Sequence, residues 1–138
     1  MTKLESLKSF RDHVRWELRC LWPYSQEASL WAALHDHPML TQLHHCCEVE
    51  HGIWERIETW LQQQSISVEP LGPFPSRFSG YNFVNLRAIL PLLRSEAEVS
   101  KHAWDRWLRE ADPAVAEPVR HWLTDLDENR QRFLASIP

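Results

Sequence analysis

The sequence has little glycine and cysteine and no long hydrophobic run. Its three glycines do not form the glycine-rich turn before a helix that a phosphate-binding loop requires. Its three cysteines include the adjacent pair Cys46 and Cys47, which is typical of small buried thiols in a reduced compartment rather than of a disulfide framework. No apolar run has the length of a membrane span, and the first residues lack the hydrophobic centre of a secretory signal. We therefore expect a cytoplasmic protein with no membrane partner.

Neither sign of charge dominates the chain. It has 15 lysines and arginines and 19 aspartates and glutamates, for a formal net charge of −4, and the two signs are interspersed. This pattern argues against a dedicated nucleic-acid surface. With 138 residues, 43% of them hydrophobic, the chain has the size of one globular domain with its own core. We expect residues 1–138 to form a single domain.

Tryptophan, in contrast, is abundant. All eight tryptophans lie in segments where apolar residues recur at steps of three and four, the spacing of one helix face. We expect most of them to pack between helices, because large aromatic side chains bury much area per residue. The pattern predicts four helices, over about 2–22, 37–64, 83–110 and 113–137.

The connections between these helices predict the topology. Pro23 ends or kinks the first helix, and residues 25–34 either continue it or form a separate short helix. Residues 65–82 hold three prolines and two glycines and show no sustained period, which indicates an extended connection. Short links join antiparallel neighbours, whereas a long link can cross the length of a bundle. The sequence therefore predicts an all-α, antiparallel four-helix bundle with one long crossover between its second and third helices.

Three glutamates fall inside the apolar stripes of these helices, where a carboxylate is costly unless it is compensated. They are Glu17, Glu50 and Glu96, and Glu50 projects into the middle of the most hydrophobic face of its helix. Glu17 and Glu50 are separated by 33 residues, as are Glu96 and Asn129 on the fourth helix. We interpret this spacing as a shared polar centre inside the bundle.

The chain resembles the ferritin-like superfamily on these residues and on the order of its connections. In that family each helix pair contributes a glutamate and a Glu-x-x-His motif that hold two metal ions in the core. The resemblance covers nearly the whole chain, and it implies that Glu17, Glu50 and Glu96 are metal ligands. The chain departs from the family pattern at three ligand positions, which hold Ile53, Asn129 and Arg132.

Two interpretations of the polar centre follow. In the first, iron or manganese is held by the three glutamates, with His13 or a cysteine completing the ligand set, and supports redox or oxygen chemistry. In the second, the bundle is metal-free: Arg130, on the inner side of the fourth helix, bridges the carboxylates. The protein would then be an interaction, regulatory or immunity-type module, with a homodimer or another protein as its partner.

Two further metal hypotheses use residues outside the polar centre. Glu48 and His51 form a local Glu-x-x-His motif, but helical geometry turns them away from the apolar face, toward solvent. A hemerythrin-like site is the other alternative, because histidines and carboxylates recur one helical turn apart. Its candidate ligands are His13, His44, Glu48, Glu98, His102, His121 and Asp125.

Overall fold

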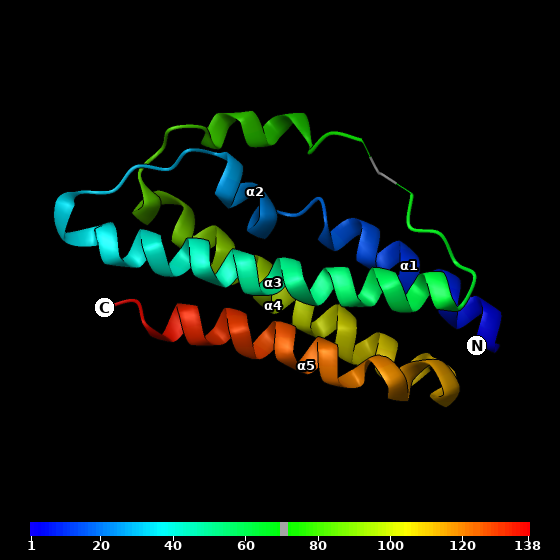
Figure 1. The fold of residues 1–138 in the computed structure, drawn as a ribbon. Helices are drawn as coiled ribbons and strands as arrows, with labels where there is room; N and C mark the ends of the chain where they lie inside the picture. The colour runs from blue at the N-terminus through cyan, green and yellow to red at the C-terminus, as the bar shows by residue number, and fades with distance from the viewer. Residues whose placement is uncertain (70–71) are drawn as a thin grey trace.

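A computed structural model of the chain describes residues 1–69 and 72–138. These residues form an all-helical bundle (Figure 1), and they contain no β-strand. Residues 70 and 71, which belong to the predicted connection, lie outside the described part. The α-helices are α1 (Lys3–Glu17), α2 (Leu21–Glu27), α3 (His37–Gln63), α4 (Leu86–Glu110) and α5 (Pro113–Ala135), and the 3₁₀ helices are η1 (Leu34–Asp36) and η2 (Ser76–Tyr81).

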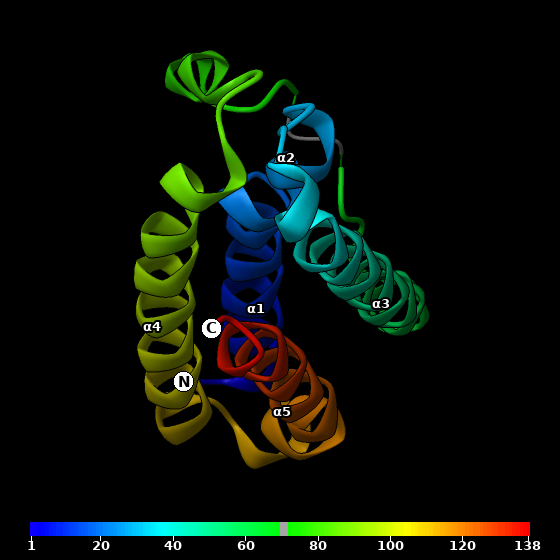
Figure 2. The ribbon, with the colours of Figure 1, turned by 90° about the vertical axis from the view of Figure 1, so that its left-hand side faces the viewer.

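The four longer helices surround a common centre when the molecule is seen from its end (Figure 2). Apolar side chains from α1, α3, α4 and α5 fill this centre in two clusters. Four tryptophans are buried and two more are partly buried against the core, as predicted, whereas two are about half exposed. The exposed pair is Trp16 and Trp31.

The first predicted helix is wrong at its C-terminal end. It breaks after Glu17, and a separate helix, α2, begins at Leu21. Pro23 lies in the first turn of α2, where its missing N–H would have no helical partner in any case, so the chain breaks before the proline rather than at it. Of the two alternatives for residues 25–34, the separate short helix agrees better with the structure. However, α2 ends at Glu27, and Ser29 has a φ of 50°, outside the helical region.

The third predicted helix begins three residues later than expected. Asn85 caps α4, because its side chain accepts a hydrogen bond from the Arg87 backbone N–H at 2.8 Å. The residues before the cap are held against residues 28–31: Trp31 N–H donates to the Val84 carbonyl at 3.1 Å, and Leu86 N–H donates to the Trp31 carbonyl at 2.8 Å. These non-local hydrogen bonds keep the chain extended up to Asn85.

The connection between α3 and α4 runs back along the length of the bundle, so that α3 and α4 begin at the same end (Figure 1). It is not structureless, because it contains η2, whose Phe78 side chain is buried in the core cluster around Tyr24 and Leu86. The link between α4 and α5 is short, and Asp112 caps α5 by accepting from the Ala114 N–H at 2.8 Å. Both features agree with the predicted positions of the long and short links.

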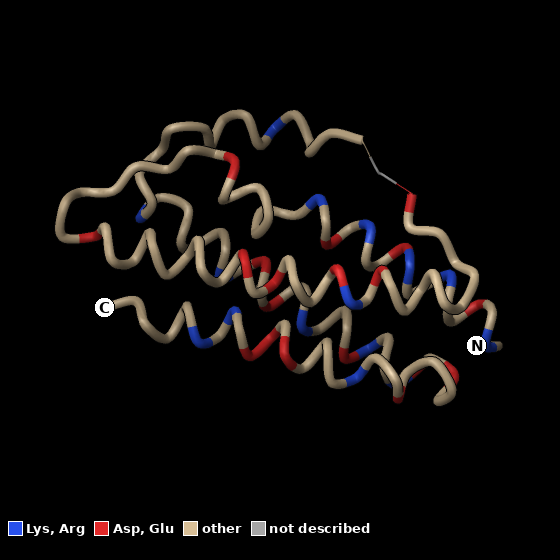
Figure 3. Tube along the Cα trace, viewed as in Figure 1, with Lys and Arg blue, Asp and Glu red and all other residues tan. Residues whose placement is uncertain are grey.

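Charges of both signs are distributed along the helices (Figure 3). Arg87, in the first turn of α4, donates two hydrogen bonds of 2.7 Å to Asp36, at the start of α3. This bidentate pair ties the beginnings of two long helices together. None of the helices in residues 1–69 and 72–138 combines the length and hydropathy needed to cross a membrane.

Candidate functional site: a buried polar layer

Each of the four long helices contributes one buried polar residue to a layer at the middle of the bundle. We call Glu17 of α1, Glu50 of α3, Ser100 of α4 and Arg130 of α5 the polar layer; all four residues are at most 3% exposed. Along the chain, each layer residue lies between members of the two apolar clusters. The polar layer therefore separates the two halves of the hydrophobic core.

Arg130 is the centre of this layer. Its Nε donates to Glu50 Oε2 at 3.0 Å, and its Nη2 donates both to Glu50 Oε1 at 2.5 Å and to Glu17 Oε2 at 2.8 Å. Its Nη1 donates to Ser100 Oγ at 3.0 Å, and the guanidinium lies 5.3 Å from the centroid of the Trp22 ring. The arginine therefore engages Glu50 through two nitrogens and bridges it to Glu17, a geometry that its planar, forked donor set favours.

The remaining carboxylate contacts come from neighbouring donors. Glu17 Oε1 accepts hydrogen bonds from the Ser100 hydroxyl and from Trp104 Nε1, the latter at 3.2 Å. Glu50 Oε1 accepts from Trp54 Nε1 at 3.3 Å. Every carboxylate oxygen of the polar layer thus has at least one donor, as burial of an ionised carboxylate requires.

Burial alone would lower the pKa of Arg130, but Glu50 and Glu17 raise it well above its usual value. Arg130 therefore stays protonated and supplies one positive charge for two carboxylates. Donors from Ser100, Trp54 and Trp104 offset part of the remaining negative charge.

Glu96 does not belong to the polar layer, although the sequence grouped it with Glu17 and Glu50. Its Oε2 accepts the backbone N–H of Leu21 at 2.8 Å, at the first residue of α2. It therefore caps α2, which begins earlier than the short helix that the sequence offered as one alternative. Burial raises the pKa of Glu96, while its hydrogen bond from Leu21 and the charge of Arg130 lower it in part.

His13 and Asn129 also lie beside the layer rather than in it. His13 is half-buried, and its ring centroid lies 5.0 Å from that of Trp104; burial lowers its pKa, while Glu17 and Asp12 raise it in part. Asn129 Nδ2 donates to the Cys46 carbonyl at 2.9 Å. Both side chains are thus committed to packing or to backbone contacts.

The residues of the two other metal hypotheses do not meet. Glu48, His51 and the hemerythrin-like candidates on α3, α4 and α5 are all exposed, and His13 is half-buried on α1. Within the described ranges, no group of three or more histidine, cysteine, aspartate or glutamate side chains is arranged to hold a metal ion.

The ferritin-like resemblance implies an iron or manganese site among the carboxylates of the core. A carboxylate-bridged metal needs oxygen lone pairs that point to a common vacant position. Here that position is taken by the Arg130 guanidinium, which contacts both Glu17 and Glu50, and Glu96 is directed to the start of α2. The residues as arranged do not fit such a metal site.

The three cysteines are buried free thiols. Burial raises the pKa of Cys46 to about 12 and that of Cys47 to about 11, and nearby Glu50 adds to both shifts. A raised pKa disfavours the thiolate, which is the nucleophilic form. The three cysteines pack in the first apolar cluster as small core residues.

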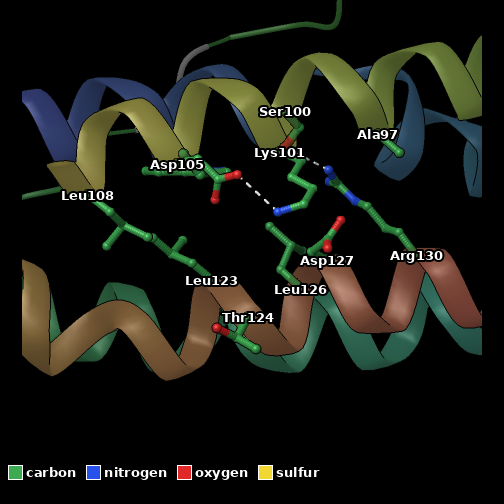
Figure 4. A pocket seen from close by; sticks show the side chains of 11 residues that line it. Ala97, Ser100, Lys101, Asp105, Leu108, Leu123, Thr124, Leu126, Asp127 and Arg130 are labelled. Atoms are coloured by element: carbon green, nitrogen blue, oxygen red, sulfur yellow. Dashed lines mark hydrogen bonds and ion pairs between the residues drawn. The ribbon is translucent and has the colours of Figure 1, made fainter.

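A small cavity of about 100 Å³ lies between α4 and α5 beside the polar layer (Figure 4). Ser100 and Arg130 contribute to its wall, and Lys101 and Asp105 form an ion pair of 3.0 Å within it. The volume is enough for a few water molecules. It is too small for most organic ligands, whose pockets usually exceed about 300 Å³.

Sequence reasoning missed the donors that complete the layer. Ser100 lies one helical turn after Glu96, on the same face of α4, so the layer position on this helix was assigned one turn too early. Trp54 and Trp104 were expected to pack, and they do, but each indole N–H also donates to a layer carboxylate. The signal available was their position one turn from Glu50 and from Ser100.

Comparison of the chain with protein-family models, with curated proteins and with solved structures finds no match.

Proposed function

We propose that this protein is a metal-free helical bundle of ferritin-like topology that acts by binding a partner at its surface, and that its core carries out no redox chemistry. The observation that carries this proposal is the Arg130 guanidinium between Glu17 and Glu50. It occupies the position that a metal ion would need and provides the positive charge that the metal would supply.

The topology supports the ferritin-like part of the proposal. In Figure 1, α1 and α3 run in opposite directions, the long connection returns over the bundle, and α4 and α5 again run in opposite directions. Two antiparallel pairs joined by one long crossover are the ferritin-like arrangement. In this arrangement the middle of the bundle is where metalloproteins place their carboxylates, and here it holds the polar layer.

Electrostatics support the metal-free part. A divalent cation beside Glu17 and Glu50 would lie within a few ångströms of a permanently charged guanidinium, and repulsion in a poorly hydrated core is strong. Binding would require Arg130 to leave the layer, which would move a buried charge away from its partners. The ion pairs of 2.5 and 2.8 Å therefore compete directly with metal.

Exposed apolar side chains support a role in binding. Leu34, Phe83 and Trp31 are 82%, 73% and 54% exposed, and hydrogen bonds hold the backbones of residues 28–31 and 83–86 side by side. We call these three residues the apolar end. Phe83 also has a φ of 62°, in a region where residues other than glycine pay about 1–3 kcal/mol. The exposed ring of Phe83 and its strained backbone do not stabilise the fold. Contact with another protein would bury the ring.

Metal analysis tests the proposal. Protein purified without an affinity tag or chelator is analysed for metals, then titrated anaerobically with ferrous and manganous ions. We expect no stoichiometric binding, and we expect Arg130→Gln to be the variant that gains affinity, because it exposes the two carboxylates. Near-stoichiometric iron or manganese in the wild type, lost in Glu50→Gln, would instead establish the carboxylate metalloprotein that the sequence resemblance implied.

A further inference from the structure

A second polar site lies away from the polar layer, beneath the long connection. A cavity of about 390 Å³ lies between the C-terminal end of α1, the η2 segment and α4. Figure 1 shows η2 above α2. Three arginines line the cavity: Arg15, Arg19 and Arg77. We call it the arginine cavity. Its volume is within the range of small-molecule pockets, about 300–1,000 Å³.

The arginines retain donors that the described residues do not use. The Nε of Arg15 is buried and has no hydrogen-bond partner in residues 1–69 and 72–138, although its Nη1 lies 3.7 Å from Asp12. Arg19 donates from Nε to the Pro73 carbonyl at 3.2 Å, which fixes its stem and leaves its terminal nitrogens without a partner in the described chain. The terminal nitrogens of Arg19 are therefore charged donors with which an acceptor on a ligand can pair.

Arg77 faces the other two arginines from the connection. Its guanidinium lies 5.0 Å from the centroid of the Phe78 ring, whose side chain is buried. This contact holds the arginine at the cavity wall. In the described ranges, neither Arg19 nor Arg77 has a carboxylate within ion-pair distance, so both positive charges are available.

Two carboxylates share the cavity with these three arginines. Asp12 is exposed at its rim and is already close to Arg11 and Arg15. Glu96 uses Oε2 to cap α2, and burial raises its pKa, although the hydrogen bond from Leu21 and the charge of Arg130 partly oppose this. Positive charge is therefore in excess on the side formed by Arg15, Arg19 and Arg77.

An aromatic side chain completes the site. Trp16 lines the same cavity and is 49% exposed, so one part of its indole is available for contact. A planar group can stack on such a surface, while guanidinium groups bind an oxyanion through paired hydrogen bonds. These two contacts recognise different parts of one ligand.

We propose that the arginine cavity binds an organic oxyanion, a carboxylate or phosphate attached to a planar ring, with the anion held by Arg15, Arg19 and Arg77 and the ring placed against Trp16. The inference deepens the proposed function, since it rests on the surface-binding role. It does not depend on the polar layer. Metal analysis and anion binding can therefore fail separately.

Calorimetric titration at low salt tests this site with benzoate, phenyl phosphate and inorganic phosphate. We expect both ring-bearing anions to bind and inorganic phosphate to bind more weakly. Arg19→Gln and Arg77→Gln should each weaken binding by about tenfold or more, as loss of a charged hydrogen bond does. Trp16→Ala should reduce phenyl phosphate to the affinity of inorganic phosphate.

Arg106→Gln is the matched control, because it removes the same charge from an exposed position of α4 outside the cavity. It should leave binding unchanged, and thermal unfolding of each variant shows whether the fold is retained. The proposal is overturned if neither ring-bearing anion binds, or if a folded Arg19→Gln, Arg77→Gln double variant binds as the wild type does. Free phosphotyrosine and a phosphotyrosine peptide distinguish the source: tighter peptide binding supports this site with a protein-borne anion, and equal binding supports it with a small molecule.

Discussion

Among single residues, Arg130 is the one whose charge allows two carboxylates to remain in an apolar core. It is 1% exposed and contacts Glu17, Glu50 and Ser100 on three other helices. Removing one partner of a buried ion pair leaves the other charge without compensation, which costs more than the pair contributes when it is intact. Breaking the polar layer should therefore cost more stability than the intact layer contributes.

We expect Arg130→Gln to lower the free energy of unfolding by about 3–5 kcal/mol, the range for a broken buried ion pair. Urea denaturation followed by circular dichroism measures this loss. Arg132→Gln, two residues further along α5 at an exposed position, is the control and should change stability little. A loss of similar size in both variants would contradict the role assigned to the buried guanidinium.

His13 should give a local pH dependence. Burial lowers its pKa below the usual value of 6.5, with Glu17 and Asp12 opposing this shift in part. The unfolded chain thus takes up a proton at a higher pH than the folded protein does, so the stability contributed by neutral His13 is complete above about pH 6.5 and is lost as the pH falls below it. Denaturation at pH 7.5 and 5.5 should show a smaller decrease for His13→Gln than for the wild type. Identical decreases would mean that other groups cause the pH dependence.

Among the secondary-structure elements, capping residues determine where the helices begin. Glu96 caps α2 from another helix, Asn85 caps α4 and Asp112 caps α5. The two local caps follow the sequence rule for Asn and Asp before a helix. The cap from Glu96 is 75 residues away from Leu21, so local sequence cannot reveal it. The sequence predicted the end or kink of the first helix at Pro23, whereas α1 ends at Glu17 and α2 begins at Leu21.

Gly52 tests the intrinsic helix propensity of α3. It lies inside this helix, and a Cβ atom added there would meet nothing within 4 Å. Gly52→Ala should therefore raise the free energy of unfolding by about 1 kcal/mol, the difference in helix propensity. Chemical denaturation measures it, with Gly72→Ala as a contrasting variant that should destabilise, because Gly72 has a φ of 79°. A destabilised Gly52→Ala would show that α3 needs flexibility or a close approach at this point.

At the scale of the whole molecule, the polar layer divides the core into two apolar clusters. One cluster joins α2 to the first halves of α3 and α4, and the other joins α1 to their second halves. A buried polar layer of this kind contributes little net stability compared with apolar residues of similar size. We expect its geometric requirements to restrict how far the four helices can slide past one another.

Joint replacement of all four polar-layer residues separates the effect of the layer on stability from its effect on how the helices pack. A variant with Glu17→Met, Glu50→Met, Ser100→Ala and Arg130→Met removes the charges together. We expect it to fold with a stability within about 3 kcal/mol of the wild type, because the gain from removing desolvated charges is offset by two tryptophan N–H groups that lose their acceptors. Denaturation and the dispersion of amide NMR signals are the measurements. A variant less stable than Arg130→Gln would show that the intact layer is strongly stabilising.

Several features of this protein depend only on local sequence pattern. Helical periodicity predicted the all-α class, the positions of α3 and α5 and the inward direction of Glu17 and Glu50, because side-chain direction along a helix follows from its 3.6-residue turn. The proline-rich stretch predicted the long connection. The position of Arg130 on the inner side of its helix suggested it as a counter-charge, and in the structure it forms ion pairs with Glu17 and Glu50.

Which of these residues contact one another depends on packing between distant parts of the chain. Whether Glu96 or Ser100 faces Arg130 depends on how far α4 is shifted along its neighbours, and a shift of one helical turn is about 5.4 Å. That shift is set by packing between residues separated by 75 or more positions in the chain, such as Leu21 and Glu96 or Glu17 and Ser100. The arginine cavity has the same origin, because Arg77 reaches Arg15 and Arg19 only after the long connection has folded back over α1.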